Sequence, residues 1–278
     1  MSKDDPLPEW ANVQVAASQQ MIAALDGRLD AYNRELNDLG KAQILGEAIA
    51  LLEALESRAR RFKFFIKASG LVEARASLEA EVSGLEEKGI PVRVESSPRL
   101  VNVLFVDTET TGLNAGDQPI SIGAVLSEID IKSGAILSEV ASYYGLREPS
   151  CEISQSAFRV HGLSKSQVQG KEFDLRELAS LFGAAELIVA HNAKFDRRML
   201  KFIDEAHRRW GCSCWDVEWP QEIGGRSLDT LCSYFAINRA APHNSISDTR
   251  AMMHALQQEQ SDGSTYLVQL LRKHGIAV

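Results

Sequence analysis

The stretch 100–106 constrains the fold most, because it is a near-continuous apolar run and a strand of that composition is buried on both faces. Segments 119–126 and 135–144 predict two further strands, with turn residues at 114–116 and 132–134 between the three. Three consecutive strands followed by alternating helices and strands are typical of a mixed sheet with helices on both faces. We therefore expect an α/β domain from residue 99 to 278.

The remaining elements of this domain are expected in a regular alternation. Apolar periodicity predicts helices over 175–182, 192–209 and 247–258. A short buried strand is expected over 187–190, and 227–231 is interpreted as a strand or strand end, which would complete a five-stranded sheet.

A different pattern fills residues 1–98. Between 12 and 88 the chain has no proline, and apolar residues recur at steps of three and four, as on one face of a helix at coiled-coil spacing. These residues are Ile22, Leu25, Leu29, Tyr32, Leu36 and Leu39, then Leu45, Ala48, Leu52 and Leu55, then Leu71, Ala74, Leu78, Val82 and Leu85. We expect two or three antiparallel helices, interrupted at Gly40 and joined to the α/β domain by a linker at 95–99. An intramolecular hairpin and a small dimerising bundle both fit.

Composition excludes several classes of protein. A net charge of −8 is not that of a polycation that coats nucleic acid, although a local basic strip or bound metal ions can still manage phosphates. Four irregularly spaced cysteines give neither a disulfide scaffold nor the paired spacing of a zinc site. No apolar signal core and no run of 18 apolar residues occurs, so a cytoplasmic protein without membrane contact is expected.

Four acidic residues stand at similar places in the expected elements. Asp107 and Glu109 end the first strand, whereas Asp196 and Asp248 each fall in the first turn of a helix. A first-turn Asp on its own is commonly a favourable partner of the helix dipole, and Asp248 also fits a capping pattern with Ser245. If the strands are neighbours, however, the four carboxylates converge, and a cluster of like charges favours hard divalent cations such as Mg²⁺ or Mn²⁺.

The order and local context of these residues resemble a known family. FVDTETTGL, AHNAKFD and HNSISD are similar to the three motifs of the DnaQ-like (DEDDh) 3′–5′ exonucleases, which include the proofreading subunit of bacterial DNA polymerase III. FRVHGLSKSQV and SLDTL resemble two further segments of that family, so the likeness covers roughly residues 100–260.

The resemblance implies a ribonuclease H-like fold, two divalent cations and hydrolysis from a 3′ end that releases nucleoside 5′-monophosphates. It assigns Asp107, Glu109, Asp196 and Asp248 as metal ligands and His243 as the general base. His243 lies five residues before Asp248, as in the histidine branch of the family. The tyrosine branch requires a tyrosine four residues before, where this chain has Asn244.

The same resemblance implies contacts with the terminal nucleotide from Thr108, Thr110, Leu113, Asn192 and Phe195. Two of these have equally plain structural interpretations, because Phe195 fits a core position and Asn192 fits a helix N-cap. His161 and His191 are expected to support the site rather than to act in it.

Two basic segments are candidates for phosphate contact. One lies on the helix of Asp196 and comprises Lys194, Arg197, Arg198 and Lys201, which equally suit a solvated helix face. The other is the mixture of basic and aromatic residues at 58–67, where stems of basic residues packed over a buried aromatic cluster are an equal alternative.

The leading functional prediction is a metal-dependent 3′–5′ exonuclease acting on single-stranded or 3′-frayed nucleic acid. A non-catalytic nucleic-acid-binding adaptor is the alternative from another class, although all five catalytic positions are filled. An exoribonuclease of the same family is a third. The N-terminal helices leave a homodimer, a polymerase or repair partner, and substrate binding open.

Overall fold

The computed structural model describes residues 9–35, 37–61, 71–93, 99–203 and 208–276. The chain divides into two compact units, Ser2–Arg99 and Leu100–Val278. The described residues of the first unit form three helices, α1 (Glu9–Arg34), α2 (Asp38–Arg61) and α3 (Leu71–Glu86). No helix in the described parts of the chain is long and apolar enough to cross a membrane.

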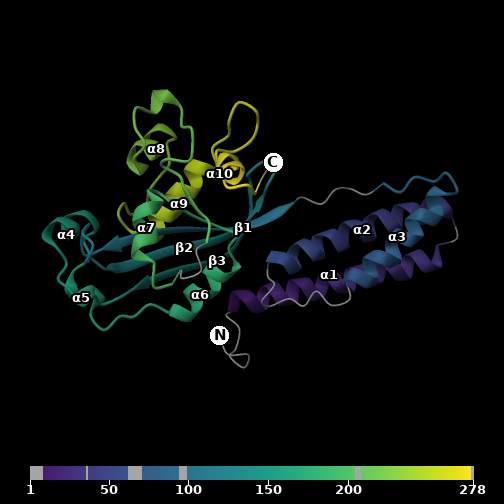
Figure 1. Cartoon of the computed structure of the whole chain (residues 1–278), viewed down its shortest axis with the longest axis horizontal. Coiled ribbons are helices and arrows are strands. Elements are labelled where there is room, and N and C mark those ends of the chain that lie inside the picture. Colours follow the sequence, from purple (N-terminus) through teal and green to yellow (C-terminus); the bar gives the residue numbers. More distant parts are fainter. Residues whose placement is uncertain (1–8, 36, 62–70, 94–98, 204–207, 277–278) are drawn as a thin grey trace. The chain divides into compact units, whose positions relative to one another are not determined.

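The N-terminal unit is a three-helix array in which α2 packs against both α1 and α3 (Figure 1). Most of the predicted apolar seam forms its core, including Leu25, Leu45, Leu52 and Leu78. Two seam positions are wrong, because Ile22 is 42% and Leu39 69% exposed, and Leu36 lies outside the described residues.

The break between the first two helices also differs from the prediction. Gly40 lies inside the first turn of α2, and the chain turns earlier, between Arg34 and Asp38. The Glu35 carboxylate accepts a hydrogen bond from the Asn37 amide, and the Asn37 side chain accepts one from the Leu39 amide. Side-chain acceptors thus organise this turn, and glycine is not needed for it.

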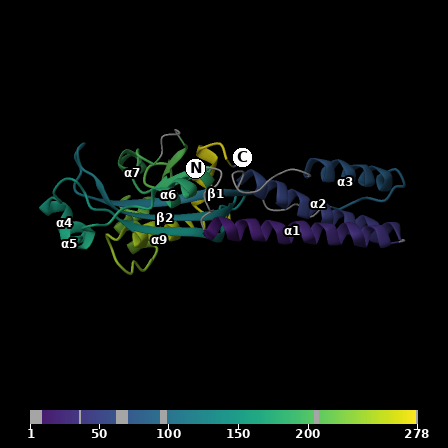
Figure 2. The same ribbon diagram turned by 90° about the horizontal axis from the view of Figure 1, so that it is seen from below.

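The second unit is a mixed five-stranded sheet with helices on both faces, as predicted (Figure 2). Its strands are β1 (Leu100–Thr110), β2 (Pro119–Asp130), β3 (Ile136–Leu146), β4 (Leu187–Ala190) and β5 (Trp210–Cys212), in the order β3-β2-β1-β4-β5. β1 runs antiparallel to β2 and parallel to β4, and β4 runs parallel to β5. The carboxyl ends of β1, β4 and β5 therefore lie next to one another at the same end of the sheet.

The helices of this unit are mostly short. They are α4 (Gln155–His161), α5 (Lys165–Val168), α6 (Leu175–Ala184), α7 (Ala193–Met199), the 3-10 turn η1 (Gln221–Ile223), α8 (Leu228–Tyr234), α9 (Ser245–Leu256) and α10 (Leu267–Lys273). α9 covers β1 and β2, whereas α6 packs against β1 and β3. Val101, Val103 and Phe105 of β1 share one buried core with residues of α9 and α10.

Two sequence expectations for this unit are wrong. The helix expected over 192–209 ends at Met199, and the fifth strand follows at Trp210–Cys212. Segment 227–231 is not that strand but the start of helix α8, whose N-cap is Ser227. The Ser227 hydroxyl accepts a hydrogen bond from the Thr230 amide, which satisfies a free amide of the first turn.

Candidate active site

The acidic residues of β1 face the helix that carries Asp248. Side chains alternate along a strand, so Asp107 and Glu109 continue the series Val101, Val103 and Phe105 that packs under α9. One carboxylate oxygen each of Asp107, Glu109 and Asp248 lies within 4.8 Å of the others. The structure therefore brings together three of the four predicted metal ligands as a single cluster.

Asp196 adjoins this cluster from the other neighbouring strand. It lies in the first turn of α7, which follows β4 at the same end of the sheet. Its side chain is 2% exposed, and its Oδ1 accepts a hydrogen bond of 2.8 Å from the Thr108 hydroxyl of β1. After burial, its charge is the next cause that raises the pKa of Asp107, although Asp196 is not one of the three residues that share a common 4.8 Å group.

The electrostatics of the cluster explain what it can bind. Burial is the largest cause that holds the pKa of Asp107 well above its usual range, and the neighbouring carboxylates add to it. Burial, followed by the charges of Asp248 and Asp196, raises the pKa of Glu109 to about 8. Burial also raises the pKa of Asp196 to about 7, against the hydrogen bond from Thr108. Buried oxygen donors with this much unbalanced negative charge fit hard divalent cations.

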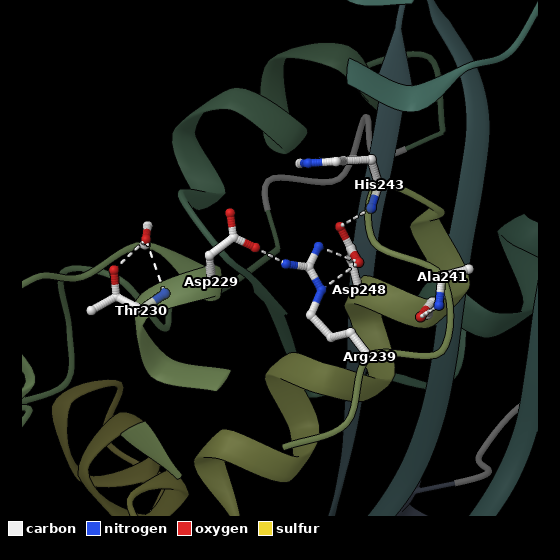
Figure 3. Close-up of polar contacts among 8 residues, drawn as sticks. Asp229, Thr230, Arg239, Ala241, His243 and Asp248 are labelled. Carbon is white, nitrogen blue, oxygen red and sulfur yellow. Dashed lines mark hydrogen bonds and ion pairs between the residues drawn. The ribbon is translucent and has the colours of Figure 1, made fainter. Parts of the chain in front are cut away.

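His243 lies in the loop that leads into α9, and its backbone is left-handed with φ 60°. Its amide donates a hydrogen bond of 3.2 Å to Asp248 Oδ2, so the loop and the carboxylate are fixed to each other (Figure 3). The imidazole extends away from the Asp248 carboxylate. A non-glycine residue in this backbone region is uncommon, and such residues cluster at functional sites.

The cap of α9 differs from the sequence expectation. Asn244 is the N-cap, and its side chain accepts a hydrogen bond from the Ser247 amide. The pairing of Ser245 with Asp248 as a capping box is therefore wrong. Ser245 is fully buried, and its hydroxyl lies 2.6 Å from that of Ser121 on β2. Asp248 is consequently not needed as a cap and has its carboxylate turned to the cluster.

The five predicted substrate residues fall into two groups. Thr108 and Thr110 are buried, and their hydroxyls bond within the protein, to Asp196 and to the Gly112 carbonyl. Leu113 is 77% exposed, Asn192 is exposed, and Phe195 is half-buried. Asn192 is the N-cap of α7 by position, but its side chain makes no capping hydrogen bond, and its φ is 66°.

Arg198 connects two of these residues, and the sequence placed it only among general basic positions. Its Nη2 donates to the Leu113 carbonyl at 2.9 Å, and its guanidinium lies 5.3 Å from the centre of the Phe195 ring. Lys194, Arg197 and Lys201 are exposed near it. Arg198 thus links α7, the helix that carries Asp196, to the loop that follows β1.

The other basic segment gives a different result. Residues 62–67 lie outside the described part of the chain. Arg58 donates hydrogen bonds to Ser18 and Gln14 of α1, and Arg61 is 5% exposed and bonds to Ser57. Arg58 therefore links α2 to α1, whereas Arg61 bonds within α2, and the aromatic residues of the packing alternative lie outside the described residues.

The two histidines expected to support the site make different contacts. His161 contacts the Thr110 carbonyl at 3.2 Å through Nε2 and accepts the Leu163 amide at Nδ1. His191 contacts the Ser213 hydroxyl at 2.9 Å, and burial lowers its pKa to about 4. A neutral imidazole at His191 adds no charge to the site.

The sequence did not identify two residues that belong to the site, Arg239 and Asp229. Arg239 forms ion pairs with Asp248 and with Asp229 of α8 (Figure 3). Asp229 belongs to the SLDTL segment, which had been noted as a likeness only. Arg239 stands in a loop without apolar periodicity, so no sequence pattern indicated that it would be buried.

The comparisons with known proteins address this same unit. The exonuclease profile RNase_T matches residues 104–256, more than half of the chain. The chain belongs to the exonuclease family. The match spans Asp107, Glu109, Asp196, His243 and Asp248, and it confirms the family that the three motifs indicated.

Individual relatives match this chain over shorter regions. A PolC-type DNA polymerase III of Thermotoga maritima is 29% identical over 163 residues, which are 53% of this chain and 11% of the polymerase. Exodeoxyribonuclease 10 of Escherichia coli is 31% identical over 109 residues, 39% of this chain and 44% of that protein. A structure of Exonuclease X with 5′-overhanging duplex DNA covers 62% of this chain and 93% of its own, at 22% identity and a TM-score of 0.41. The chain therefore spans less than half the length of these curated relatives.

Proposed function

We propose that this exonuclease degrades DNA from the 3′ end in a metal-dependent reaction and releases nucleoside 5′-monophosphates. The observation that carries the proposal is the convergence of Asp107, Glu109 and Asp248 beside Asp196 within a family-matched domain. DNA is favoured over RNA because Exodeoxyribonuclease 10 and the PolC-type polymerases are among its relatives.

The four carboxylates would hold two divalent cations, Mg²⁺ or Mn²⁺. When bound, such a pair lowers the pKa of an attacking water and stabilises charge on the leaving oxygen of a phosphodiester. His243, at the entrance to α9, is proposed to accept the proton from that water. An imidazole suits this role because its ordinary pKa lies near neutral pH.

The surface beside the cluster is proposed to hold the terminal nucleotide. The exposed Leu113 side chain offers an apolar contact for the base, and Phe195 offers an aromatic ring. Thr108 and Thr110 would contribute through the backbone, since their hydroxyls are already bonded, and Asn192 lies exposed at the start of α7. The cations of α7 attract the phosphates that follow.

A kinetic experiment tests the chemistry. Single-stranded DNA is incubated with the protein in Mg²⁺, Mn²⁺ or EDTA, and wild type is compared with Asp107→Ala and His243→Ala. We expect no hydrolysis in EDTA and a loss of at least about a thousandfold in kcat for both variants, because each removes a group that acts on the reacting atoms. Hydrolysis in EDTA, or full activity of Asp107→Ala, would refute the mechanism. A matched RNA substrate decides the exoribonuclease alternative.

The role of the N-terminal unit is a separate proposal. Its three packed helices suit a protein-interaction module, either for a homodimer or for a polymerase or repair partner. All four cysteines are free, which suits the reducing cytoplasm. Light scattering on the full chain and on residues 99–278 tests the dimer, since only the full chain should then have twice its monomer mass.

A further inference from the structure

Arg239 occupies a buried position between two helices of the active-site region. Its side chain is 7% exposed. On one edge, Nη2 and Nε donate to Asp248 Oδ1 at 2.6 and 3.1 Å, and on the other, Nη1 donates to Asp229 Oδ1 (Figure 3). The guanidinium therefore bridges α8 and α9 with a fixed geometry.

The two oxygens of Asp248 are used differently in this arrangement. Within the described part of the chain, Oδ1 accepts both hydrogen bonds from Arg239, whereas Oδ2 accepts the His243 amide. A carboxylate oxygen can take two partners, so Oδ1 is filled and Oδ2 keeps one free lone pair. Rotating the carboxylate would break charge-assisted hydrogen bonds on its filled side.

Burial of a guanidinium is costly unless its charge is balanced. If Asp248 were the sole partner of Arg239, the guanidinium would neutralise its negative charge, and less of that charge would be available to a metal ion. Asp229, whose side chain is 69% exposed, supplies a second carboxylate that does not belong to the cluster. Asp229 can thus stabilise Arg239 without touching the metal ligands.

The guanidinium also lies close to the rest of the cluster. Its positive charge acts on Asp107 and Glu109 as well as on Asp248. Among the described residues, it is the cation that forms an ion pair with one of the four carboxylates. Its position therefore bears on how the cluster receives an ion.

We propose that Arg239 is a positioning residue of the nuclease, held in place by Asp229, that fixes Asp248 with its free oxygen toward the metal site. Through the hydrogen bond from His243 to Asp248, the same contact sets the loop of the general base. This inference rests on the proposed metal-dependent function and names residues outside the five catalytic positions that support it.

The test is a calorimetric titration of Mn²⁺ into the metal-free full chain, with kcat and KM measured on the same preparations. The variants are Arg239→Gln, Arg239→Lys, Asp229→Asn and the double variant Asp229→Asn/Arg239→Gln. Arg250→Gln is the control, because Arg250 lies on the same helix α9 but is exposed and pairs with Glu139.

We expect Arg239→Gln to weaken Mn²⁺ binding by about tenfold or more and to lower kcat with little change in KM, as for other groups that orient metal ligands. Arg239→Lys should recover part of the affinity, since it keeps the charge and one donor. Asp229→Asn should act in the same direction but less, and the double variant should be no weaker than Arg239→Gln. Arg250→Gln should match wild type.

Other outcomes distinguish a failure of this inference from a failure of the proposed function. Tighter Mn²⁺ binding by Arg239→Gln would overturn the inference, because the guanidinium would then compete with the ion. A lower melting temperature with unchanged affinity would also overturn it. If Arg239→Gln does not fold, unchanged affinity in Asp229→Asn, which keeps the buried arginine, decides against it. Absence of Mn²⁺ binding by wild type would defeat the proposed function itself.

Discussion

At the scale of single residues, the acidic cluster makes the stability of the metal-free protein depend on pH. The pKa of Glu109 rises from 4.5 to about 8 and that of Asp196 from 3.8 to about 7. A raised pKa in the folded state means that the folded protein holds these protons more tightly than the unfolded chain. The resulting stability is present below about pH 4 and is lost as pH rises through 7 and 8.

Glu109→Gln tests this pH dependence in the metal-free enzyme. We expect it to raise the melting temperature by several °C at pH 8 and to leave it nearly unchanged at pH 4, because a pKa change of one unit is worth about 1.4 kcal/mol. Differential scanning calorimetry in EDTA across this range measures the difference between variant and wild type. A difference that is constant with pH would contradict the electrostatic account.

Metal ions should reverse the same trend. Saturating Mg²⁺ neutralises the carboxylates of the folded state and should therefore raise the melting temperature of wild type most at pH 8. It should do much less for Glu109→Gln, which lacks one ligand. Equal stabilisation of both proteins by Mg²⁺ would place the binding site elsewhere.

The residues of the site differ in how far the sequence could locate them. Asp107 and Glu109 lie at the end of an apolar strand and Asp248 in the first turn of a helix, so their place in the fold follows from local pattern. Arg239 could not be found this way, since its burial depends on two carboxylates that approach only in the folded chain.

At the scale of elements, the position of Asp248 depends on how closely α9 approaches β2. A Cβ added at Gly123 of β2 would lie 2.3 Å from the Ile246 nitrogen and 2.4 Å from the Ser245 carbonyl carbon. These are backbone atoms, so a side chain at Gly123 would push the start of α9 away from the sheet. The Gly123 carbonyl also accepts a hydrogen bond from Thr249.

Gly123→Ala is therefore expected to cost about 1–3 kcal/mol of stability, as overpacking does, and to weaken Mn²⁺ binding by displacing Asp248. Gly183→Ala on α6 is the control, because nothing lies within 4 Å of its added Cβ. Thermal unfolding and calorimetric titration of both variants measure the two effects. Wild-type metal affinity in Gly123→Ala would show that this contact does not position the site.

The strands were predictable where they carry an uninterrupted apolar run. β1, β2 and β3 were found, and so was β4 with only four residues, but the three residues of β5 gave no signal. In α8, Leu228 and Leu231 are spaced as on a helix face behind the cap at Ser227, and the short apolar run was interpreted as a strand. A run of that length does not distinguish the two without the cap.

At the scale of the whole molecule, the chain joins two units with separate cores. Leu52 is 1% exposed and belongs to the buried core of the N-terminal unit. Leu52→Ala should therefore cost about 2–5 kcal/mol in that unit and leave kcat on single-stranded DNA within about twofold of wild type. A loss of kcat well beyond twofold in the folded variant would show that the helices contribute to catalysis.

The central claim is tested most directly by one ladder experiment. A single-stranded oligonucleotide with distinct labels at its two ends is incubated with full-length protein in Mg²⁺, and products are resolved to single nucleotides over time. We predict that the 5′ label appears on progressively shorter strands while the 3′ label is released at once, and that Asp107→Ala or EDTA abolishes both changes. Release of the 5′ label first would contradict a 3′–5′ exonuclease at this site. So would a product ladder from Asp107→Ala that is the same as that from wild type.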